Sequence, residues 1–351
     1  MPRPRPQPQQ SYNLNPEPVR WSLLAAVFAL ALIFAPVPPM IVEEFYSRDM
    51  YPWLQDVFTG ATNFIPLALL DAMLIGLALA FVLRVRRLFY VARQRGIIDA
   101  IWEAIRRIVR LAGLVTILFF WAWGFNYRRQ PLEATLPERQ AARPAVDVVE
   151  GALIDAGSLA ARLRPFVANG PELSYADLET RLKGPLNAAL KQLGRLPLSR
   201  PARPKYSLVL TPFFSWAGMT GMVNPLGLET IVHPDLLPYE RPFVLAHEWA
   251  HLSGHADEAE ASAIGWLACM KGGNELAYSA SLYLVVEATA SLPEERRRVM
   301  LTRLDSAVRS DLDVIVRRAR QEQAPVQYRR ALALILTPSI RNAMGSYEIS
   351  R

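Results

Sequence analysis

Hydrophobic and polar positions divide the sequence into two regions of different character. The first part of the chain carries three long apolar runs, Trp21–Ala35, Phe64–Leu83 and Leu111–Phe125, and the first extends through a proline-containing stretch to Val42. About 20 apolar residues in a helix cross the roughly 30 Å of hydrocarbon in a bilayer, and core helices seldom run so long without a polar face. The runs therefore predict a transmembrane region of three helices over residues 19–127.

The chain beyond residue 127 has the shorter, amphipathic pattern of a water-soluble domain, residues 128–351. Short apolar clusters predict strands at Tyr206–Leu210 and Leu228–His233, and helical spacing covers most of the rest. The predicted fold class is α+β and mostly helical, with a small strand element just upstream of a helical pair. The expected helices of this domain are Pro144–Arg164, Glu172–Leu193, Arg241–Ser253, Asp257–Met270, Glu275–Ala290, Pro293–Arg320 and Val326–Leu336.

The charge distribution assigns an orientation to this arrangement. The formal net charge is +7, and the excess lies mostly in residues 84–110, where eight arginines accompany only Asp99 and Glu103. Because apolar runs flank this loop and no nucleic-acid recognition motif accompanies it, the charge favours a bilayer surface over a nucleic-acid partner. Basic loops stay on the cytoplasmic side, which predicts a multi-pass inner-membrane protein with a cytoplasmic N-terminus and residues 128–351 outside the cytoplasm.

Four details complete the membrane region. Residues 1–18 are rich in Pro and Gln and are expected to form a disordered cytoplasmic tail. No small-x-small cleavage site follows Ala35, which favours a retained anchor over a cleaved signal peptide. The spacing in Leu88–Val109 predicts an interfacial helix between two spans. Asp71 interrupts the second run, and we expect it near the outer interface or bonded to a neighbouring helix rather than in a proton path.

The sequence HEWAH at residues 247–251 carries the candidate chemistry. On a helix, His247 and His251 lie one turn apart and point the same way, so their imidazoles can bind one metal ion. Glu248 lies beside them, where a carboxylate can take a proton from a water molecule that the metal acidifies. The single Cys269 excludes a multi-cysteine site, so any metal would depend on His and carboxylate ligands. The pattern is that of an HExxH zinc hydrolase.

A catalytic zinc ion needs a third protein ligand, and the candidates after Gly254 are His255 and three acidic residues. His255 follows the glycine directly and is expected to be exposed or to face the substrate. Glu258 has Ser262 one turn later, which could orient a ligating histidine, whereas Glu260 has Ile264 at that position. Asp257 completes the spacing HExxHxxGxxD of another zincin branch. The pattern therefore favours Glu258 and leaves Glu260 and Asp257 as alternatives.

HEWAH followed by EAEAS at residues 258–262 resembles the gluzincin class, whose third ligand opens an ExxxD or ExxAN motif. That resemblance implies Glu258 as the ligand, with Ser262 in the Asp/Asn position. The chain more specifically resembles domain-of-unknown-function family 3810, a bacterial membrane family with a predicted zinc-peptidase character. The segments that carry this resemblance are VEEFYSRDMYP at 42–52, Asp71, WGFNYRR at 123–129, GMVNPLGLE at 221–229, the HExxH region and Tyr278-Ser279.

These features predict a membrane-anchored zinc metallopeptidase that acts on peptides or proteins outside the cytoplasm. Zinc would be bound by His247, His251 and Glu258, with Glu248 as general base and Tyr278 as a donor to the oxyanion. The segment Thr220–His233 is expected to hold extended substrate through backbone hydrogen bonds, although its polar residues could equally stabilise a turn. The alternative is a catalytically silent zincin-fold module for signalling or assembly in the envelope. The sequence predicts neither the substrate nor the oligomeric state.

Overall fold

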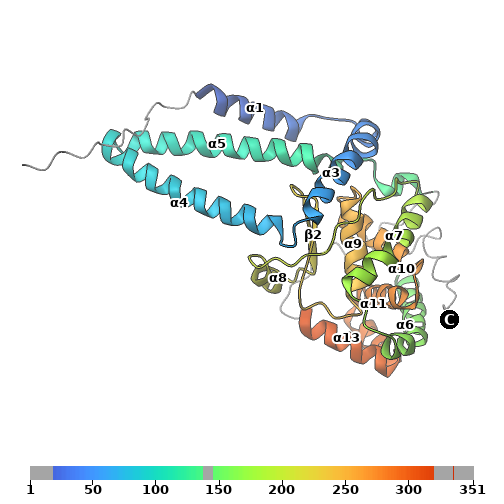
Figure 1. Cartoon of the computed structure of the whole chain (residues 1–351). Coiled ribbons are helices and arrows are strands. Elements are labelled where there is room, and N and C mark those ends of the chain that lie inside the picture. Colours follow the sequence, from blue (N-terminus) through green and yellow to red (C-terminus); the bar gives the residue numbers. More distant parts are fainter. Residues whose placement is uncertain (1–18, 137–144, 320–334, 336–351) are drawn as a thin grey trace, which may run out of the picture. The chain divides into compact units, whose positions relative to one another are not determined.

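The computed structural model describes residues 19–136, 145–319 and Ile335, and the described chain is mostly helical (Figure 1). It divides into two compact units, of which the smaller comprises residues 1–36 and 77–120 and the larger residues 37–76 and 121–351. The larger unit therefore includes residues 37–76, which the apolar pattern assigned to the membrane region. The expected tail at residues 1–18 lies outside the described residues.

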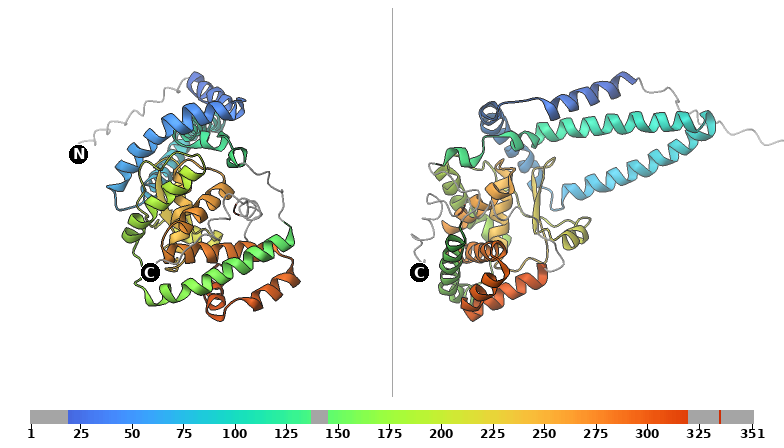
Figure 2. Two further views of the ribbon diagram at one scale, coloured as in Figure 1. Left: turned by 90° about the vertical axis from the view of Figure 1, so that its right-hand side faces the viewer. Right: turned by 180° about the vertical axis from the view of Figure 1, so that it is seen from behind.

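The smaller unit contains α1 (Val19–Phe34), α5 (Ile97–Ala122) and most of α4 (Leu69–Arg95). Helices α4 and α5 run antiparallel to each other and are joined at Gly96 (Figures 1 and 2). Gly96 has a φ of 95°, a conformation that ends the helix and that glycine adopts without steric cost. The prediction of one interfacial helix over Leu88–Val109 is therefore wrong, because those residues are the ends of two helices.

The three apolar runs are not three uninterrupted helices. Helix α1 ends at Phe34, before three closely spaced prolines, and α4 begins only at Leu69, after a turn that contains Pro66. In the described residues, no single helix is long and apolar enough to cross a bilayer. The pair Val19–Phe34 and Pro39–Asn63 meets that requirement together, with a bend of 106° between its two parts.

Short helical segments from two places in the sequence begin the larger unit. The first group is α2 (Pro39–Ile41), the π-helix η1 (Val42–Met50) and α3 (Tyr51–Asn63). The second group is η2 (Gly124–Arg128) and η3 (Leu132–Thr135), and η1 packs against η2. These segments contact the helices of the candidate site described below.

The centre of the larger unit is a helical core. The order along the chain is α6 (Val146–Asn169), α7 (Tyr175–Gln192), α8 (Thr211–Ala217), α9 (Arg241–Leu252), α10 (Glu258–Met270), α11 (Asn274–Ser291), α12 (Glu294–Arg303) and α13 (Ser306–Ala319). Helix α10 is buried along nearly its whole length, because α7, α9 and α11 all pack against it. Helix α6 lies along α11 and also contacts α13 (Figure 2).

Most of the expected helices of this unit are confirmed, and one is divided. Pro293–Arg320 contains two helices, because Asp305 accepts hydrogen bonds from the backbone N–H groups of Ala307 and Val308 and so starts α13. The predicted helix Val326–Leu336 falls outside the described residues apart from Ile335, which is helical and buried.

The sheet of the described residues has two antiparallel strands, β1 (Gly221–Asn224) and β2 (Glu229–Val232), with Gly221 opposite Val232. The prediction of a strand at Leu228–His233 is confirmed. The prediction at Tyr206–Leu210 is wrong, because only Lys205 pairs with β2, in a single parallel bridge. The hydroxyl of Ser207 accepts from the N–H of Leu210, and this local bond favours a turn that leads into α8.

The start of α4 is held by two carboxylates with structural partners. Both oxygens of Glu229 accept from the first N–H groups of α4, Leu69 and Leu70, and Oε2 also accepts from Nζ of Lys205. The expected pairing of Asp71 is with a loop and not with a helix, since its Oδ2 accepts from the N–H of Leu208 at 2.7 Å. Both carboxylates therefore have structural hydrogen-bond partners at the start of α4 or in the loop beside it.

Candidate metal centre

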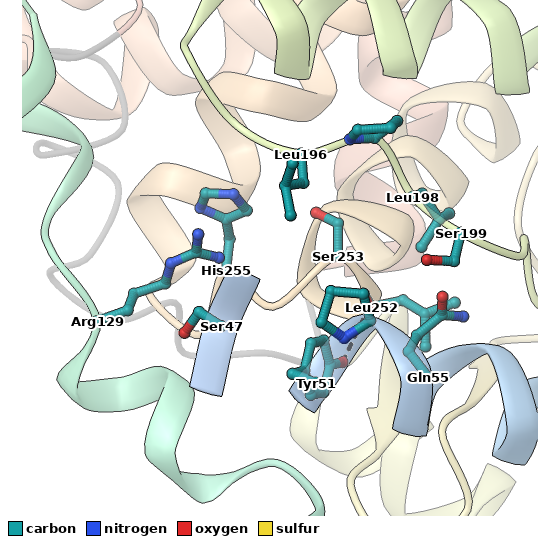
Figure 3. Close-up of a pocket in the computed structure, with 12 residues that line it drawn as sticks. Ser47, Tyr51, Gln55, Arg129, Leu196, Leu198, Ser199, Leu252, Ser253 and His255 are labelled. Atoms are coloured by element: carbon teal, nitrogen blue, oxygen red, sulfur yellow. Dashed lines mark hydrogen bonds between the residues drawn. The ribbon is translucent and has the colours of Figure 1, made fainter. Parts of the chain in front are cut away.

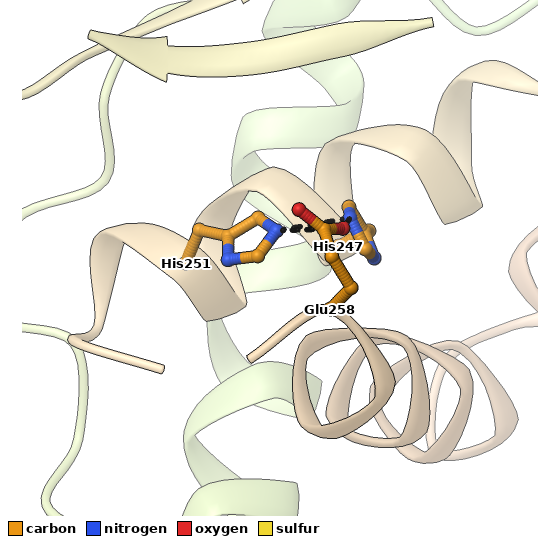
Figure 4. Close-up of side chains that lie close together, drawn as sticks. All are labelled: His247, His251 and Glu258. Atoms are coloured by element: carbon orange, nitrogen blue, oxygen red, sulfur yellow. Dashed lines mark hydrogen bonds and ion pairs between the residues drawn. The ribbon is translucent and has the colours of Figure 1, made fainter. Parts of the chain in front are cut away.

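Two adjacent helices bring three potential metal ligands together. His247 and His251 lie one turn apart on α9, the chain turns after Leu252, and Glu258 is the first residue of α10. The Nε2 atoms of the histidines are 3.1 Å apart, and Oε2 of Glu258 is 3.2 Å from His247 Nε2 and 3.3 Å from His251 Nε2 (Figure 4). In the described part of the chain, these residues form the group of His, Cys and acidic side chains that could hold a metal ion.

The distances and the donor types fit a zinc ion. Ligands about 2.0–2.1 Å from a tetrahedral ion are about 3.3 Å from one another, which matches all three sides of this triangle. The Nδ1 of His251 donates to the carbonyl oxygen of His255 at 2.7 Å, so in the neutral ring Nε2 is an electron-pair donor. Oε2 of Glu258 also presents an electron pair, and it lies 3.3 Å from Nε2 of His251. Because two electron-pair donors repel each other at this distance, the arrangement requires a cation or a proton between them.

A group that orients His247 also lies where the sequence indicated. The Nδ1 of His247 is 3.2 Å from Oγ of Ser262, one turn after Glu258 on α10. The two helices approach closely at this point, because a Cβ added to Gly265 would lie 2.9 Å from the backbone nitrogen of His247. A hydroxyl is a weaker acceptor than the carboxylate expected at this position, but it holds the same nitrogen.

Glu248 is positioned to accept and donate a proton beside the three potential ligands. Its side chain is buried, and burial raises its pKa to about 8, against a smaller lowering effect of His251. In the described part of the chain, its Oε2 has no hydrogen-bond partner. Strand β1 lies directly against it, since a Cβ added to Gly221 would be 2.7 Å from Glu248 Oε1. Glycine at 221 therefore makes room for this carboxylate.

The turn between the ligand helices is held by an ion cluster, which we call the Glu43 cluster (Glu43, Arg48, Arg129 and Arg195). All of its members except Arg48 are buried. Arg129 binds both oxygens of Glu43 at 2.9 Å and also donates to the carbonyl oxygen of Gly254 at 2.8 Å. Arg195 donates to Glu43 at 2.9 Å and to the carbonyl oxygen of Gln130 at 2.8 Å. Burial alone would raise the pKa of Glu43, but the two arginines outweigh it and lower the pKa to about 2.

Figure 3 shows Arg129 of this cluster beside the turn, together with Ser47 and Tyr51. Tyr51 of α3 donates to the carbonyl oxygen of Leu252 at 2.9 Å, and Arg129 lies beside His255. The space left among these groups is about 10 Å³, which is at the limit for one water molecule. Because the carbonyl group of His255 orients His251, the cluster supports the metal site through the backbone of the turn.

The alternative ligands have other partners, and the expectation that His255 is exposed is wrong, because its side chain is buried beside Glu260. Asp257 caps α10 by accepting from the N–H groups of Ala259 and Glu260. Glu260 is buried, accepts from the N–H of Leu132 at 2.7 Å and lies 3.3 Å from Nδ1 of His255. The structure therefore brings Glu258, and not these two carboxylates, to the histidines.

Tyr278 is also not brought to the three ligands. It is fully buried on α11, and its hydroxyl donates to Oδ2 of Asp311 on α13. The single hydroxyl proton is thus already used, which gives Tyr278 a role in joining two helices. Asn224 and Glu229 contact each other, since Asn224 Nδ2 donates to Oε1 of Glu229 at 3.0 Å within the β1–β2 turn.

Sequence reasoning did not identify a second possible catalytic pair, Ser215 and His233. The Nε2 of His233 is 2.9 Å from Oγ of Ser215, but its Nδ1 accepts from the N–H of Asp235 at 3.1 Å. The neutral ring must therefore carry its proton on Nε2 and cannot remove one from the serine. This geometry does not support a serine hydrolase.

Comparison with known proteins gives one match. The model of the family described as "Protein of unknown function (DUF3810)" matches residues 46–331, which is most of the chain. No curated protein and no solved structure matches the chain.

Proposed function

We propose that this chain, which belongs to the family described as "Protein of unknown function (DUF3810)", is a membrane-anchored zinc metallopeptidase. One observation carries the proposal. Three donor atoms, from His247, His251 and Glu258, form a triangle with sides of 3.1–3.3 Å next to the buried carboxylate of Glu248. Two imidazoles and one carboxylate, with an adjacent acid, form the ligand and base set of a metal-dependent amide hydrolase.

The chain's own residues supply positioning and proton transfer. Zinc, when bound by these three ligands, supplies the Lewis acidity that acidifies water and polarises a carbonyl group. Glu248 Oε2 accepts the proton of the attacking water and passes it to the leaving amine. The site is open on one side, because half of the Glu258 side chain is exposed (51%) while His251 is not (9%). A substrate would approach past Glu258.

Strand β1 supports a peptide as the substrate. In the described residues β2 pairs with one edge of β1 and no strand pairs with the other. Gly221 of this strand touches Glu248, so a peptide that extended the sheet along β1 would pass the general base. Substrate binding through the backbone favours extended segments over folded ones.

Exposed apolar surface supports anchoring in a bilayer. Large apolar side chains are more than half exposed on α1, including Leu23, Leu24 and Val27, and on α4, including Leu79 and Phe81. A water-soluble surface seldom carries so many neighbouring apolar groups. On α1 and α5, Ala25 and Gly113 allow close approach, as small residues do between membrane helices. In this proposal residues 84–110 face the cytoplasm and the metal centre faces outward.

The test is metal content and peptide hydrolysis by the full chain in detergent. We expect about one zinc per wild-type chain, loss of zinc in His251→Ala, and retained zinc in Glu248→Gln with hydrolysis of a peptide mixture reduced by about 10²-fold or more. Peptide cleavage unchanged in Glu248→Gln would contradict the assigned base.

A matched pair of variants tests the third ligand. Glu258→Gln should lower zinc affinity, whereas Asp257→Asn should keep it, because Asn caps a helix as well as Asp does. Loss of zinc in Asp257→Asn alone would exchange the two roles. Zinc bound by a chain that cleaves no peptide would favour the silent signalling or assembly module.

A further inference from the structure

A cavity of about 660 Å³ lies between α4 and α5 of the smaller unit, far along the chain from the metal ligands. Its walls include Arg84, Arg86, Arg87 and Tyr90 from α4 and Arg107 and Arg110 from α5. The chain reverses direction at Gly96, so α4 and α5 are antiparallel. A residue on α4 therefore faces the residue on α5 that is about equally far from Gly96 along the chain. Five guanidinium groups from two helices thus line one open space.

The charge of this cavity is strongly unbalanced. Between residues 84 and 110 eight arginines accompany two carboxylates, and one of these, Glu103, is in contact with Arg87, Arg106 and Arg107. Like charges held around one space repel each other, and a bound anion removes that cost. The cavity is therefore suited to a negatively charged group.

We propose that this cavity binds a phosphate-ester anion, held by Arg84, Arg86, Arg87, Arg107 and Arg110. A guanidinium group binds phosphate oxygens through two parallel N–H donors, and tetrahedral phosphate accepts from several directions at once. A carboxylate accepts mainly in its own plane and would engage fewer of the five arginines. The volume is within the range of small-molecule sites, so the ligand is larger than one inorganic phosphate.

The surroundings favour a lipid headgroup as the source of the phosphate. Leu83 lines the cavity, and exposed Phe81 and Val82 precede it on α4. On α5, exposed Leu114 and Leu118 follow Arg110. Apolar side chains therefore begin where the arginines end, as they would around a phospholipid with its headgroup in the cavity. A soluble phosphate ester shares the headgroup chemistry but would not use these apolar contacts.

The experiment uses the full chain in a nonionic detergent. Binding is measured for dioctanoyl phosphatidylglycerol, dioctanoyl phosphatidylcholine and glycerol 3-phosphate at fixed salt. We expect the phosphatidylglycerol to bind about tenfold or more tightly than the phosphatidylcholine, whose headgroup carries no net charge. Tighter binding of phosphatidylglycerol than of glycerol 3-phosphate supports a lipid source, and equal binding supports a soluble ester. Binding of neither anion overturns the proposal.

Two double variants separate a built site from general attraction to positive charge. Arg86→Gln with Arg110→Gln removes two cavity arginines and should weaken binding about tenfold or more. Arg93→Gln with Arg95→Gln removes the same charge from α4 outside the cavity and should change binding less than threefold. Equal weakening by the two pairs would overturn the proposal, since the anion would then respond only to net charge. The zinc content should be unchanged in all of these variants.

Discussion

Two glutamates of this protein each contact three arginines, and their surroundings differ. Glu43 lies with Arg48, Arg129 and Arg195 in the larger unit, where the side chains of Arg129 and Arg195 are 6% and 1% exposed and that of Arg48, at the edge of the cluster, is 50% exposed. Glu103 lies with Arg87, Arg106 and Arg107 in the smaller unit, where the same measure is 37%, 27% and 14%. We call the second group the Glu103 cluster.

The two clusters differ in what surrounds the arginine donors that do not bind the glutamate. In the Glu43 cluster, backbone carbonyl oxygens of Gly254 and Gln130 accept from the arginines, and the remaining space among the neighbouring groups is about 10 Å³. The Glu103 cluster borders a cavity of about 660 Å³ that further arginines line. The same pairing of residues thus makes a closed support in one unit and, as we propose, an open binding site in the other.

The largest effect is expected from Glu43→Gln. It removes the charge that neutralises two buried arginines, and uncompensated buried charge typically costs about 3–5 kcal/mol. Because the cluster holds the turn that orients His251, zinc affinity should fall about tenfold or more. Chemical denaturation and zinc titration of the full chain measure the two effects.

The matched control is Glu103→Gln, which should change the free energy of unfolding by less than about 1 kcal/mol, as partly exposed ion pairs do. It should leave zinc affinity unchanged. Similar losses of stability in the two variants would remove the distinction between the clusters.

The pH dependence of stability offers a second, smaller test. The pKa of Glu43 is lowered to about 2 in the folded chain, from an ordinary value of 4.5, so its ionised form stabilises the fold. This contribution is complete above pH 4.5 and is lost as the pH falls towards 2, and it amounts to about 3 kcal/mol for a shift of this size. The stability difference between wild type and Glu43→Gln, measured without metal, should therefore shrink between pH 5 and pH 3. A difference that stays constant over this range would mean that Glu43 is not the titrating group.

The sequence predicts the local part of the candidate site and not its support. His247, Glu248 and His251 are separated by less than two helical turns, and Ser262 is one turn from Glu258, so helical periodicity alone relates them. Glu43, Arg129 and Arg195 meet across 86 and 152 positions of the chain. No periodicity connects such residues, and their pairing exists only after the chain has folded.

Hydrophobic periodicity also fails to show where two of the predicted secondary-structure elements are interrupted or absent. The division of the chain at Gly96 and the loss of the strand at Tyr206–Leu210 depend on single local features, a positive φ and the hydroxyl of Ser207. Hydrophobic periodicity averages over such features. The sequence predicts the buried helices α9, α10 and α11 to within a few residues, because their burial requires apolar side chains over several turns.

An intermediate effect is expected when arginine is replaced by lysine in each cluster. The planar guanidinium group of Arg129 donates to both oxygens of Glu43 and to the carbonyl oxygen of Gly254. The ammonium group of lysine cannot reproduce this planar geometry. Arg129→Lys should therefore cost about 1–3 kcal/mol, while Arg106→Lys, in a single partly exposed pair, should cost less than about 1 kcal/mol. Thermal unfolding of the two variants makes this comparison. Equal costs would indicate that only charge, and not hydrogen-bond geometry, distinguishes the clusters.

The smallest expected effect is a gain of binding in the Glu103 cluster. Glu103 forms ion pairs with Arg87, at 3.7 Å, and with Arg107, which both line the cavity, so it competes with the anion that we propose for them. Glu103→Gln should therefore tighten binding of dioctanoyl phosphatidylglycerol by about three- to tenfold at low salt. The gain should fall in 0.5 M salt, because partly exposed charges are screened over a few ångströms there. Weaker binding in this variant would show that Glu103 orients the arginines for the anion and does not compete with it.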